Sequence, residues 1–178
     1  MQPGAAREVW RGRYLRAVVE SWPGAGGDYE VIHKFDAVAV VPITPTNEVV
    51  LVRQFRPAVR SAMLEIPAGL LDVEGEDALT CAGRELAEET GFGHAEMAFL
   101  GGVYLSPGFT DEYIHIFWAR TDPVPVGTPE TGIEVVHMPF AEAVTVARGG
   151  RFRNATTALG LLLAASTPAL RDAAPPPS

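Results

Sequence analysis

Short runs of alternating apolar and polar residues, separated by clusters of Gly, Pro, Asn and Asp, fill most of this chain. Such a pattern predicts many short strands. The most apolar candidate covers residues 29–43, with residues 37–41 as its buried centre, and residues 49–55 are expected to return from a turn at 44–48 as a hairpin. Further strands are expected at residues 11–22, 63–69, 97–105, 113–119 and 134–138.

Helical spacing of apolar residues predicts three helices, at residues 76–90, 140–148 and 156–165. The apolar residues expected on one side of the first helix are Ala78, Leu79, Ala82 and Leu86. Gly91 follows this helix, where a left-handed cap favours glycine. Largely antiparallel strands combined with a few helices predict an α+β fold or an α/β/α sandwich.

The chain has 178 residues, enough for one compact domain with its own core. We expect an N-terminal strand or arm at residues 1–28, a main domain at 29–170, and a disordered tail rich in Ala and Pro at 171–178. Cys81 is the only cysteine, so an internal disulfide is excluded and a reducing compartment is compatible with the sequence.

The net charge of −8 argues against non-specific binding to nucleic acid, which needs a basic surface. It does not argue against a small phosphorylated substrate, because a bound divalent cation can invert the local field. The N-terminus has no apolar signal core, and the longest apolar run, at residues 158–165, is too short to span a membrane. We therefore expect a cytoplasmic protein with neither nucleic acid nor membrane as a partner.

The end of the first predicted helix carries three carboxylates, Glu85, Glu88 and Glu89. Glu85 and Glu89 are one turn apart, and like charges at this spacing destabilise a helix by roughly 0.2–0.5 kcal/mol. The helix dipole also disfavours anions there. A hard cation would relieve both penalties, and carboxylate oxygens without nearby His or Cys ligands suit Mg²⁺, with Mn²⁺ as a substitute. The alternative is a solvated acidic face on a surface helix.

A wider pattern around these glutamates resembles the Nudix box, G-x5-E-x7-R-E-U-x-E-E-x-G-U, where U is a bulky apolar residue. The matching residues are Gly69, Glu76, Arg84, Glu85, Leu86, Glu88, Glu89, Gly91 and Phe92. Six residues instead of five separate Gly69 from Glu76, and the extra one lies in a predicted loop that can absorb it. The resemblance implies a Nudix-type α/β/α sandwich with a mixed, largely antiparallel sheet, and hydrolysis of a diphosphate linkage.

The same resemblance implies roles for the residues of the box. Glu85 and Glu89 are expected to bind metal directly, Glu88 to bind metal or position the attacking water, and the backbone carbonyl of Ala68 to add a further ligand. Two or three Mg²⁺ ions are implied. Arg84 is expected to hold the carboxylates in place by a bidentate pair, with a simple surface ion pair as the alternative.

Three more glutamates are candidates for the chemistry. Glu76 is expected to orient a water or a metal ligand, although its charge could instead match the dipole at the helix start. A late glutamate acts as general base in proteins of this kind. Glu130, in a Gly- and Pro-bounded loop at residues 127–132, is the first candidate for that role, and Glu134 is the second.

Three segments outside the box resemble the ADP-ribose pyrophosphatase subgroup: residues 64–69, residues 53–59, and Pro107, fifteen residues after Phe92. The implied reaction converts ADP-ribose to AMP and ribose 5-phosphate. An alternative is a pyrophosphatase for another nucleoside-diphosphate sugar, such as GDP-mannose or ADP-glucose. A non-catalytic module that senses ADP-ribose fits less well, because all three box glutamates are present.

The subgroup resemblance also implies a substrate site and a partner. Residues expected to bind substrate are Arg56 and Arg53 for the diphosphate, Glu30 and Tyr14 for adenine, and Gly108 and Glu112 for the terminal ribose. The alternatives are edge-strand charges for the two arginines and an ordinary loop acid for Glu112. The resemblance also implies a homodimer that exchanges its N-terminal strands, so that the adenine-binding residues could come from the partner subunit.

Overall fold

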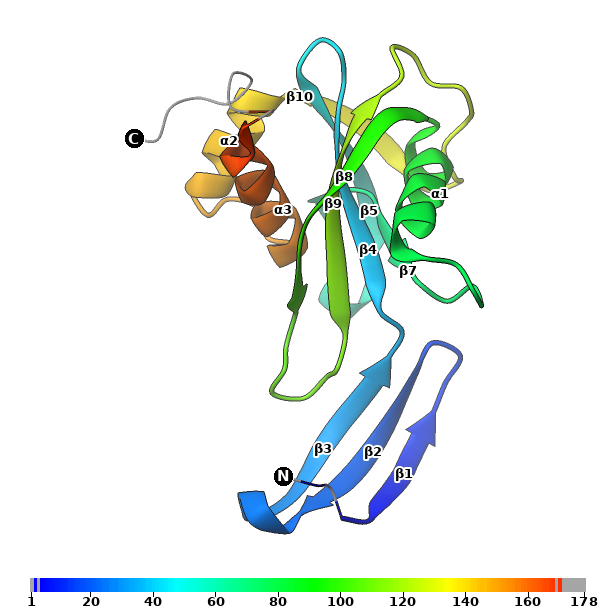
Figure 1. Cartoon of the computed structure of the whole chain (residues 1–178), viewed down its shortest axis with the longest axis vertical. Helices are drawn as coiled ribbons and strands as arrows, with labels where there is room; N and C mark the ends of the chain where they lie inside the picture. The colour runs from blue at the N-terminus through cyan, green and yellow to red at the C-terminus, as the bar shows by residue number, and fades with distance from the viewer. Residues whose placement is uncertain (1, 3, 169, 171–178) are drawn as a thin grey trace.

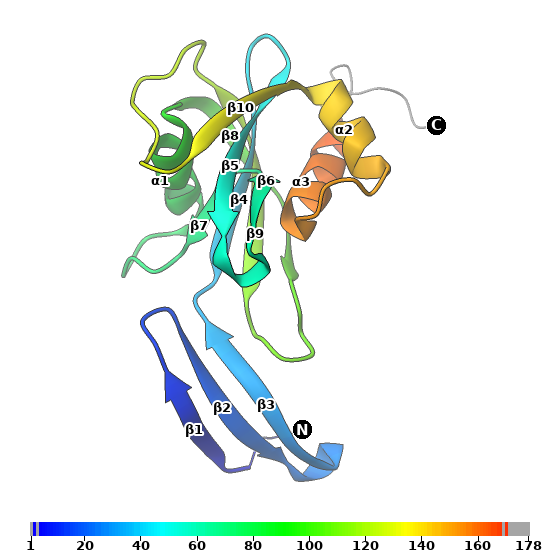
Figure 2. The same cartoon turned by 180° about the vertical axis from the view of Figure 1, so that it is seen from behind.

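The computed structural model describes residues 2, 4–168 and 170 and shows a three-layer body with a smaller sheet extending from one end (Figure 1). Helix α1 covers one face of the main sheet, and α2 and α3 cover the opposite face (Figures 1 and 2). The expected α/β/α sandwich is therefore confirmed. The predicted tail at residues 171–178 lies outside the described residues.

The small sheet, here called the arm, consists of β1 (Ala6–Arg11), β2 (Leu15–Trp22) and β3 (Gly27–Lys34). The strands of the main sheet are β4 (Ala37–Ile43), β5 (Glu48–Arg56), β6 (Ser61–Glu65), β7 (Ala68–Leu70), β8 (His94–Tyr104), β9 (Tyr113–Thr121) and β10 (Glu134–Pro139). The helices are α1 (Ala78–Thr90), α2 (Phe140–Arg148) and α3 (Ala155–Ser166). Among the described residues, no helix is long and apolar enough to cross a membrane.

The main sheet has the strand order β10-β5-β4-β9-β8, with β6 paired to β5 and β7 paired to β4. Strands β4 and β9 are parallel and the other pairs are antiparallel, so the sheet is mixed and largely antiparallel as expected. Every residue of β4 is buried, because helices cover both of its faces. Alternate residues of β4 accordingly feed two core clusters, Ala39 and Val41 toward α2 and α3, and Val38 and Val40 toward α1.

The expected hairpin of β4 and β5 is paired only next to its turn, at Ile43 and Val49. Beyond that point the two strands diverge, and residues 61–70 pair with both, β6 with β5 and β7 with β4. The single strand predicted at 63–69 is therefore two short strands, interrupted at Ile66 and Pro67. Pro67 lacks an N–H to donate, and its carbonyl accepts a hydrogen bond from Val40. This divergence places β7 beside the end of α1.

The long strand predicted at residues 29–43 divides into β3 and β4 at Phe35 and Asp36. Strand β3 pairs with β2 in the arm, whereas β4 pairs within the main sheet. Residues 29–34, expected in the main domain, thus belong to the arm sheet, and the boundary falls at Phe35–Asp36 instead of after residue 28. The burial pattern changes at the same place, from mostly exposed residues in β3 to fully buried residues in β4.

The arm is joined to the body by the loop between β8 and β9, residues 105–112. Ile32 of β3 donates a backbone hydrogen bond to Phe109 and accepts one from Asp111. The imidazole of His33 contacts the carboxylate of Asp111, and Lys34 forms an ion pair with Glu112. These contacts fix the position of the 105–112 loop relative to the arm.

Helix α1 begins at Ala78, two residues later than predicted. The Asp77 side chain accepts hydrogen bonds from the backbone N–H groups of Leu79 and Thr80, which satisfies two donors at the helix start. Gly91 ends the helix with φ 76°, as the sequence predicts. The predicted apolar side is wrong at Leu79, which is 48% exposed, because the buried side of the helix is rotated toward Cys81 and Glu89.

Candidate active site

The last two turns of α1 present three carboxylates with very different exposure. Glu89 is only 6% exposed, the Glu85 side chain is 13% exposed, and the Glu88 side chain is 46% exposed. A buried carboxylate loses its hydration, which costs free energy unless donors or cations replace the water. The solvated acidic face considered as an alternative therefore fits Glu88 only, while Glu85 and Glu89 face the body of the protein.

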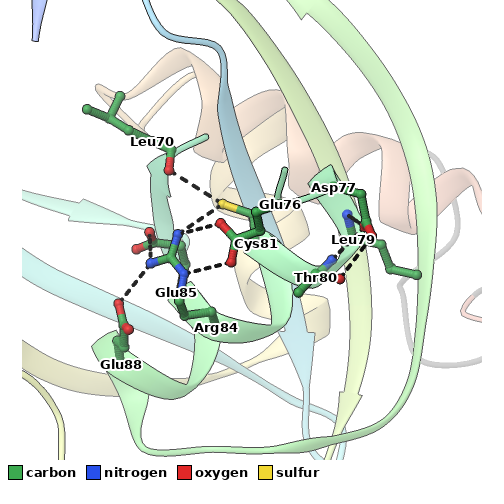
Figure 3. Close-up of polar contacts among 9 residues, drawn as sticks. All are labelled: Leu70, Glu76, Asp77, Leu79, Thr80, Cys81, Arg84, Glu85 and Glu88. Carbon is green, nitrogen blue, oxygen red and sulfur yellow. Dashed lines mark hydrogen bonds and ion pairs between the residues drawn. The ribbon is translucent and has the colours of Figure 1, made fainter. Parts of the chain in front are cut away.

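Arg84 contacts two of these carboxylates, Glu85 and Glu88, and also Glu76, which precedes the helix (Figure 3). Its Nε and Nη2 atoms each donate to Glu76 at 2.9 Å, and its Nη1 donates to Glu85 at 2.6 Å and to Glu88 at 3.1 Å. The bidentate pair with Arg84 lowers the pKa of Glu76, and Glu76 in turn raises the pKa of Arg84. Arg84 thereby cross-links the start of the helix to its acidic end.

Glu89 is held by neutral donors instead. The backbone N–H of Ala68 donates to its carboxylate at 3.0 Å, and Gln54 Nε2 lies 3.5 Å away. Burial raises the pKa of Glu89 to about 7, and it also raises the pKa of Glu85. Both carboxylates are thus energetically unfavourable as anions in the absence of an additional cation.

The backbone at Gly69 passes directly against Glu85. A Cβ atom at this position would lie 2.0 Å from the carboxyl carbon of Glu85 and 2.1 and 2.3 Å from its oxygens. Only glycine permits this approach. Gly69 therefore meets the end of α1 although it is one residue out of step with the box, and the extra residue is taken up in the loop before the helix, as expected.

We predict that Gly69→Ala reduces turnover by ~100-fold with little change in the melting temperature, because the new methyl group displaces the flexible end of Glu85 and not the backbone. Steady-state kinetics and thermal denaturation would test this. Gly27→Ala is a matched control, since nothing lies within 4 Å of its Cβ position. Equal kinetics for Gly69→Ala and the wild type would contradict the prediction.

The donor set around β7 and α1 suits a hard divalent cation. It consists of carboxylate oxygens and backbone carbonyls. The nearby sulfur of Cys81 contacts Arg84 at 3.3 Å, but burial raises the pKa of this thiol to about 12, so it is a poor metal ligand. Among the described residues, no three acidic, His or Cys side chains are gathered closely enough to hold a metal ion. The reason is visible in the contacts, because Arg84 holds Glu85 and Glu88, while Ala68 and Gln54 hold Glu89. The chemistry of the residues therefore fits Mg²⁺, and binding requires Glu85 and Glu88 to turn away from Arg84.

The 122–133 loop is anchored to the end of α1. The carbonyl of Gly91 accepts hydrogen bonds from Val126 and Gly127, and Glu130 donates its backbone N–H to the carbonyl of Glu88 at 2.9 Å. The charge of Glu130 contributes to the raised pKa of Glu85, so its carboxylate lies within electrostatic reach of the cluster. The structure thus brings Glu130 and the box glutamates together.

A cavity of about 480 Å³ lies next to the carboxylates. Ala68 and Gly69, which contact Glu89 and Glu85, form part of its wall. Arg56 and Glu112 line the same cavity, and the positive charge of Arg56 acts on Glu89. Arg56 and Glu112, both expected from the sequence to bind substrate, therefore line one cavity, and the acidic end of α1 lies behind its wall at Ala68 and Gly69.

Four of the residues expected to bind substrate lie outside this cavity. Tyr14 is in the turn between β1 and β2, Glu30 is exposed on β3, and Gly108 lines a separate hollow between the arm and the 105–112 loop. Arg53 is on β5 but forms an ion pair with Glu134 at 3.2 Å. Arg53 and Arg56 are an odd number of residues apart, so strand alternation already indicates that they face opposite sides.

Three residues at the site were not anticipated: Gln54, which donates to Glu89, Lys34, which pairs with Glu112 at the cavity, and Glu65, which pairs with Arg56. Gln54 could have been predicted from the sequence, because it lies two residues before Arg56 on β5 and therefore on the same face of the strand. The contacts of Lys34 and Glu65 join segments far apart in the chain or in different strands, and no local pattern indicates them.

The raised pKa of Glu89 predicts that the metal-free protein becomes less stable to unfolding as the pH rises. Its pKa is about 7 in the folded state against 4.5 ordinarily, so the folded state binds more protons between these values. The free energy of unfolding should therefore fall as pH rises from about 4.5 to 7. Relative to Glu89→Gln, the wild type should lose on the order of 1–3 kcal/mol between pH 5 and pH 8.

Urea denaturation in EDTA at the two pH values measures this difference. Glu142→Gln, an exposed acid on α2, serves as the control for the loss of one carboxylate. If the free energy of unfolding changed equally with pH in the wild type and in Glu89→Gln, ionisation of the buried Glu89 would not destabilise the fold, and the prediction would be wrong.

Comparison with known proteins identifies the family. The model of the NUDIX domain matches residues 33–158, most of the chain. This protein therefore belongs to the Nudix family. The matched segment runs from the end of the arm to α3 and contains every residue described above at the cavity.

Three curated relatives are similar to the chain over the same region. It is 36% identical to an ADP-ribose pyrophosphatase of Mycobacterium tuberculosis, over 79% of this chain and 70% of that protein. It is 36% identical to a GDP-mannose pyrophosphatase of Salmonella arizonae, over 73% of each. It is 38% identical to a methanol dehydrogenase activator of Bacillus methanolicus, over 64% of this chain. The match spans only 62% of the length of that activator.

A solved structure shares the fold. The crystal structure of an ADP compounds hydrolase superimposes with a TM-score of 0.75, covers 97% of this chain and 96% of the other, and is 24% identical in sequence. At this identity the likeness supports the Nudix fold of the whole described chain, arm included.

Proposed function

We propose that this protein hydrolyses the diphosphate linkage of ADP-ribose, giving AMP and ribose 5-phosphate, with Mg²⁺ as its cofactor and Mn²⁺ as a substitute. The observation that carries the proposal is the placement of the buried carboxylates of Glu85 and Glu89 against Gly69 and Ala68, which line one cavity together with Arg56. Anionic residues favour a cation at one side of the cavity, and an arginine favours a phosphate at the other. The name of the Mycobacterium tuberculosis relative supports the substrate.

Within this proposal, the residues near the end of α1 bind the metal ions or position the residues that do. Glu85, Glu89, Glu88 and the carbonyl of Ala68 would hold two or three ions, which when bound lower the pKa of a coordinated water and offset the charge of the diphosphate. Arg84 contacts Glu85 and Glu88 through its Nη1 atom and would release them as they turn to the ions, while Glu76 keeps Arg84 beside them. Glu76 would thus act through Arg84, to which it is bound by two hydrogen bonds.

The remaining residues would handle substrate and protons. Arg56 would bind the diphosphate, Glu112 the terminal ribose, and Glu130 would accept the proton of the attacking water. Glu130 suits this role because its loop is hydrogen-bonded to Glu88, so its carboxylate can approach the cluster without disturbing α1. A second candidate function is hydrolysis of another nucleoside-diphosphate sugar, supported by the equally similar GDP-mannose pyrophosphatase.

A substrate panel tests the proposal. Purified protein with Mg²⁺ would be incubated with ADP-ribose, ADP-glucose, GDP-mannose, FAD, NADH and 8-oxo-dGTP, and the products separated by chromatography. We expect the highest kcat/KM for ADP-ribose. A preference for GDP-mannose would support the second candidate, and the absence of turnover on every compound would overturn both and favour an ADP-ribose-sensing module.

We also propose a homodimer that covers the arm. All six residues of β1 are exposed, including Val9 and Trp10, and a small sheet without an apolar layer against it is poorly stable in water. A second copy would bury this surface and could bring Tyr14 and Glu30 to its partner's cavity. Light scattering should then give twice the chain mass of 19.0 kDa, whereas the mass of a single chain would contradict the proposed homodimer.

We place the protein in the cytoplasm. Cys81 is fully buried on the side of α1 that faces the sheet, and burial raises the pKa of its thiol to about 12, so it is unreactive. A protein without disulfides suits that compartment.

A further inference from the structure

A buried glutamate outside the Nudix box lines the cavity itself. Glu65 ends β6 and is only 3% exposed, yet it lines the cavity with Arg56. Both of its carboxylate oxygens have partners. Oε2 accepts a hydrogen bond from Arg56 Nε at 2.9 Å and forms an ion pair with Arg56 Nη2 at 2.7 Å, and Oε1 accepts from Asn154 Nδ2 at 2.8 Å.

Asn154 connects this pair to α3. Its side-chain oxygen caps the helix by accepting from the backbone N–H of Thr157 at 2.8 Å. The hydroxyl of Thr157 in turn accepts from the backbone N–H of Ile66, the residue after Glu65, at 3.0 Å. Glu65 is therefore tied to the start of α3 by its side chain and by its neighbour's backbone, so its carboxylate has little freedom to move.

We infer that Glu65 is the positioning residue that holds the Arg56 guanidinium in place to bind the diphosphate, with Asn154 as its anchor on α3. The inference takes its substrate from the proposed function, whereas the pair of Glu65 and Arg56 is observed independently of any substrate. The guanidinium side chain is 41% exposed, so Glu65 engages one edge of it and leaves the remainder open to the cavity. The guanidinium donates one hydrogen bond to Oε2 of this buried carboxylate and forms a close ion pair with the same atom, and these two contacts restrain its orientation more than solvent alone would.

Kinetics should show a selective loss of binding. In Glu65→Gln we expect the KM for ADP-ribose to rise roughly tenfold, the scale typical of a partner that orients a binding group, with kcat within ~2-fold of the wild type. On an Arg56→Ala background the same substitution should add no further rise, because its effect passes through Arg56. Glu142→Gln, the same chemical change on an exposed residue of α2, should leave both parameters unchanged.

A spectroscopic readout separates this inference from the proposed function. In ¹⁵N-labelled protein, the Nε–H signal of Arg56, assigned by its loss in Arg56→Ala, should exchange slowly with water in the wild type and at least ~10-fold faster in Glu65→Gln. If the wild type hydrolyses no nucleotide sugar, the proposed function fails, and this signal still decides the pairing. Unchanged exchange, an unchanged KM, or a full Glu65→Gln effect without Arg56 would overturn the inference.

A second variant covers the case in which Glu65→Gln does not fold. Asn154→Ser keeps a good helix-capping residue but removes the amide that donates to Glu65. It should raise the KM for ADP-ribose by ~2–3-fold and accelerate exchange of the Arg56 signal, with kcat unchanged. Wild-type values for both would contradict the role of Asn154 and Glu65 in positioning Arg56.

Discussion

Replacing Glu85 or Glu89 by glutamine is expected to reduce kcat by ~100-fold or more while the protein stays folded. Each residue is a proposed metal ligand, and loss of a ligand should exceed the 10–100-fold effects typical of outer partners. Glutamine keeps the size of the side chain and one acceptor oxygen, so the Ala68 N–H that bonds to Glu89 is still satisfied. Metal-free Glu89→Gln should even gain stability above pH 7, because it removes a buried charge.

Two measurements separate metal binding from folding in these variants. Mn²⁺ affinity, followed by electron paramagnetic resonance, should fall together with kcat, and the urea unfolding midpoint in EDTA should not fall. Glu142→Gln again controls for the loss of one negative charge. Full Mg²⁺-dependent turnover in both Glu85→Gln and Glu89→Gln would remove these residues from the metal site.

In Arg56→Ala we expect the second large effect, a rise of roughly 10–100-fold in the KM for ADP-ribose. A charge-assisted hydrogen bond contributes about 1.5–3 kcal/mol, which corresponds to this range. The Mg²⁺ concentration for half-maximal activity should change little, because Arg56 is paired with Glu65 and not with the proposed ligands. The variant also leaves Glu65 without its main partner, so a lower melting temperature is expected.

Arg53→Ala is the matched control for Arg56→Ala. Arg53 lies on the same strand but pairs with Glu134, outside the cavity. We expect its KM to stay within ~2-fold of the wild type. An equal rise in KM for both variants would indicate that the net charge of β5, and not a specific contact of Arg56, governs binding.

The sequence was most informative where a fixed spacing lies within one element. Helix α1, its Gly91 cap and the three glutamates near its end follow from intervals along the chain, and the structure bears out the helix and its cap. The degree of burial was not predictable. Glu89 is buried because β5 and β7 supply Gln54 and Ala68 around it, and these contacts come from segments more than twenty residues away.

Strand connections were less predictable than strand positions. The apolar pattern continues from β3 into β4, yet the two strands join different sheets, because β3 pairs with β2 and β4 with β7 and β9. Likewise, alternation within residues 61–70 could not show that they fill the gap between β4 and β5. The cavity and the Arg56–Glu65 pair depend on that gap, so they could be found only in the fold.

The proposed reaction is a metal-dependent hydrolysis at the acidic end of α1, and a titration with Mg²⁺ tests this metal dependence directly. ADP-ribose would be incubated with the wild-type protein and with Glu85→Gln while Mg²⁺ is raised from an EDTA-treated start, and AMP and ribose 5-phosphate would be quantified. We predict equal amounts of the two products, formed only with Mg²⁺ by the wild type and reduced ~100-fold in the variant. Equal rates in EDTA and in Mg²⁺, or equal rates for the two proteins, would contradict the account.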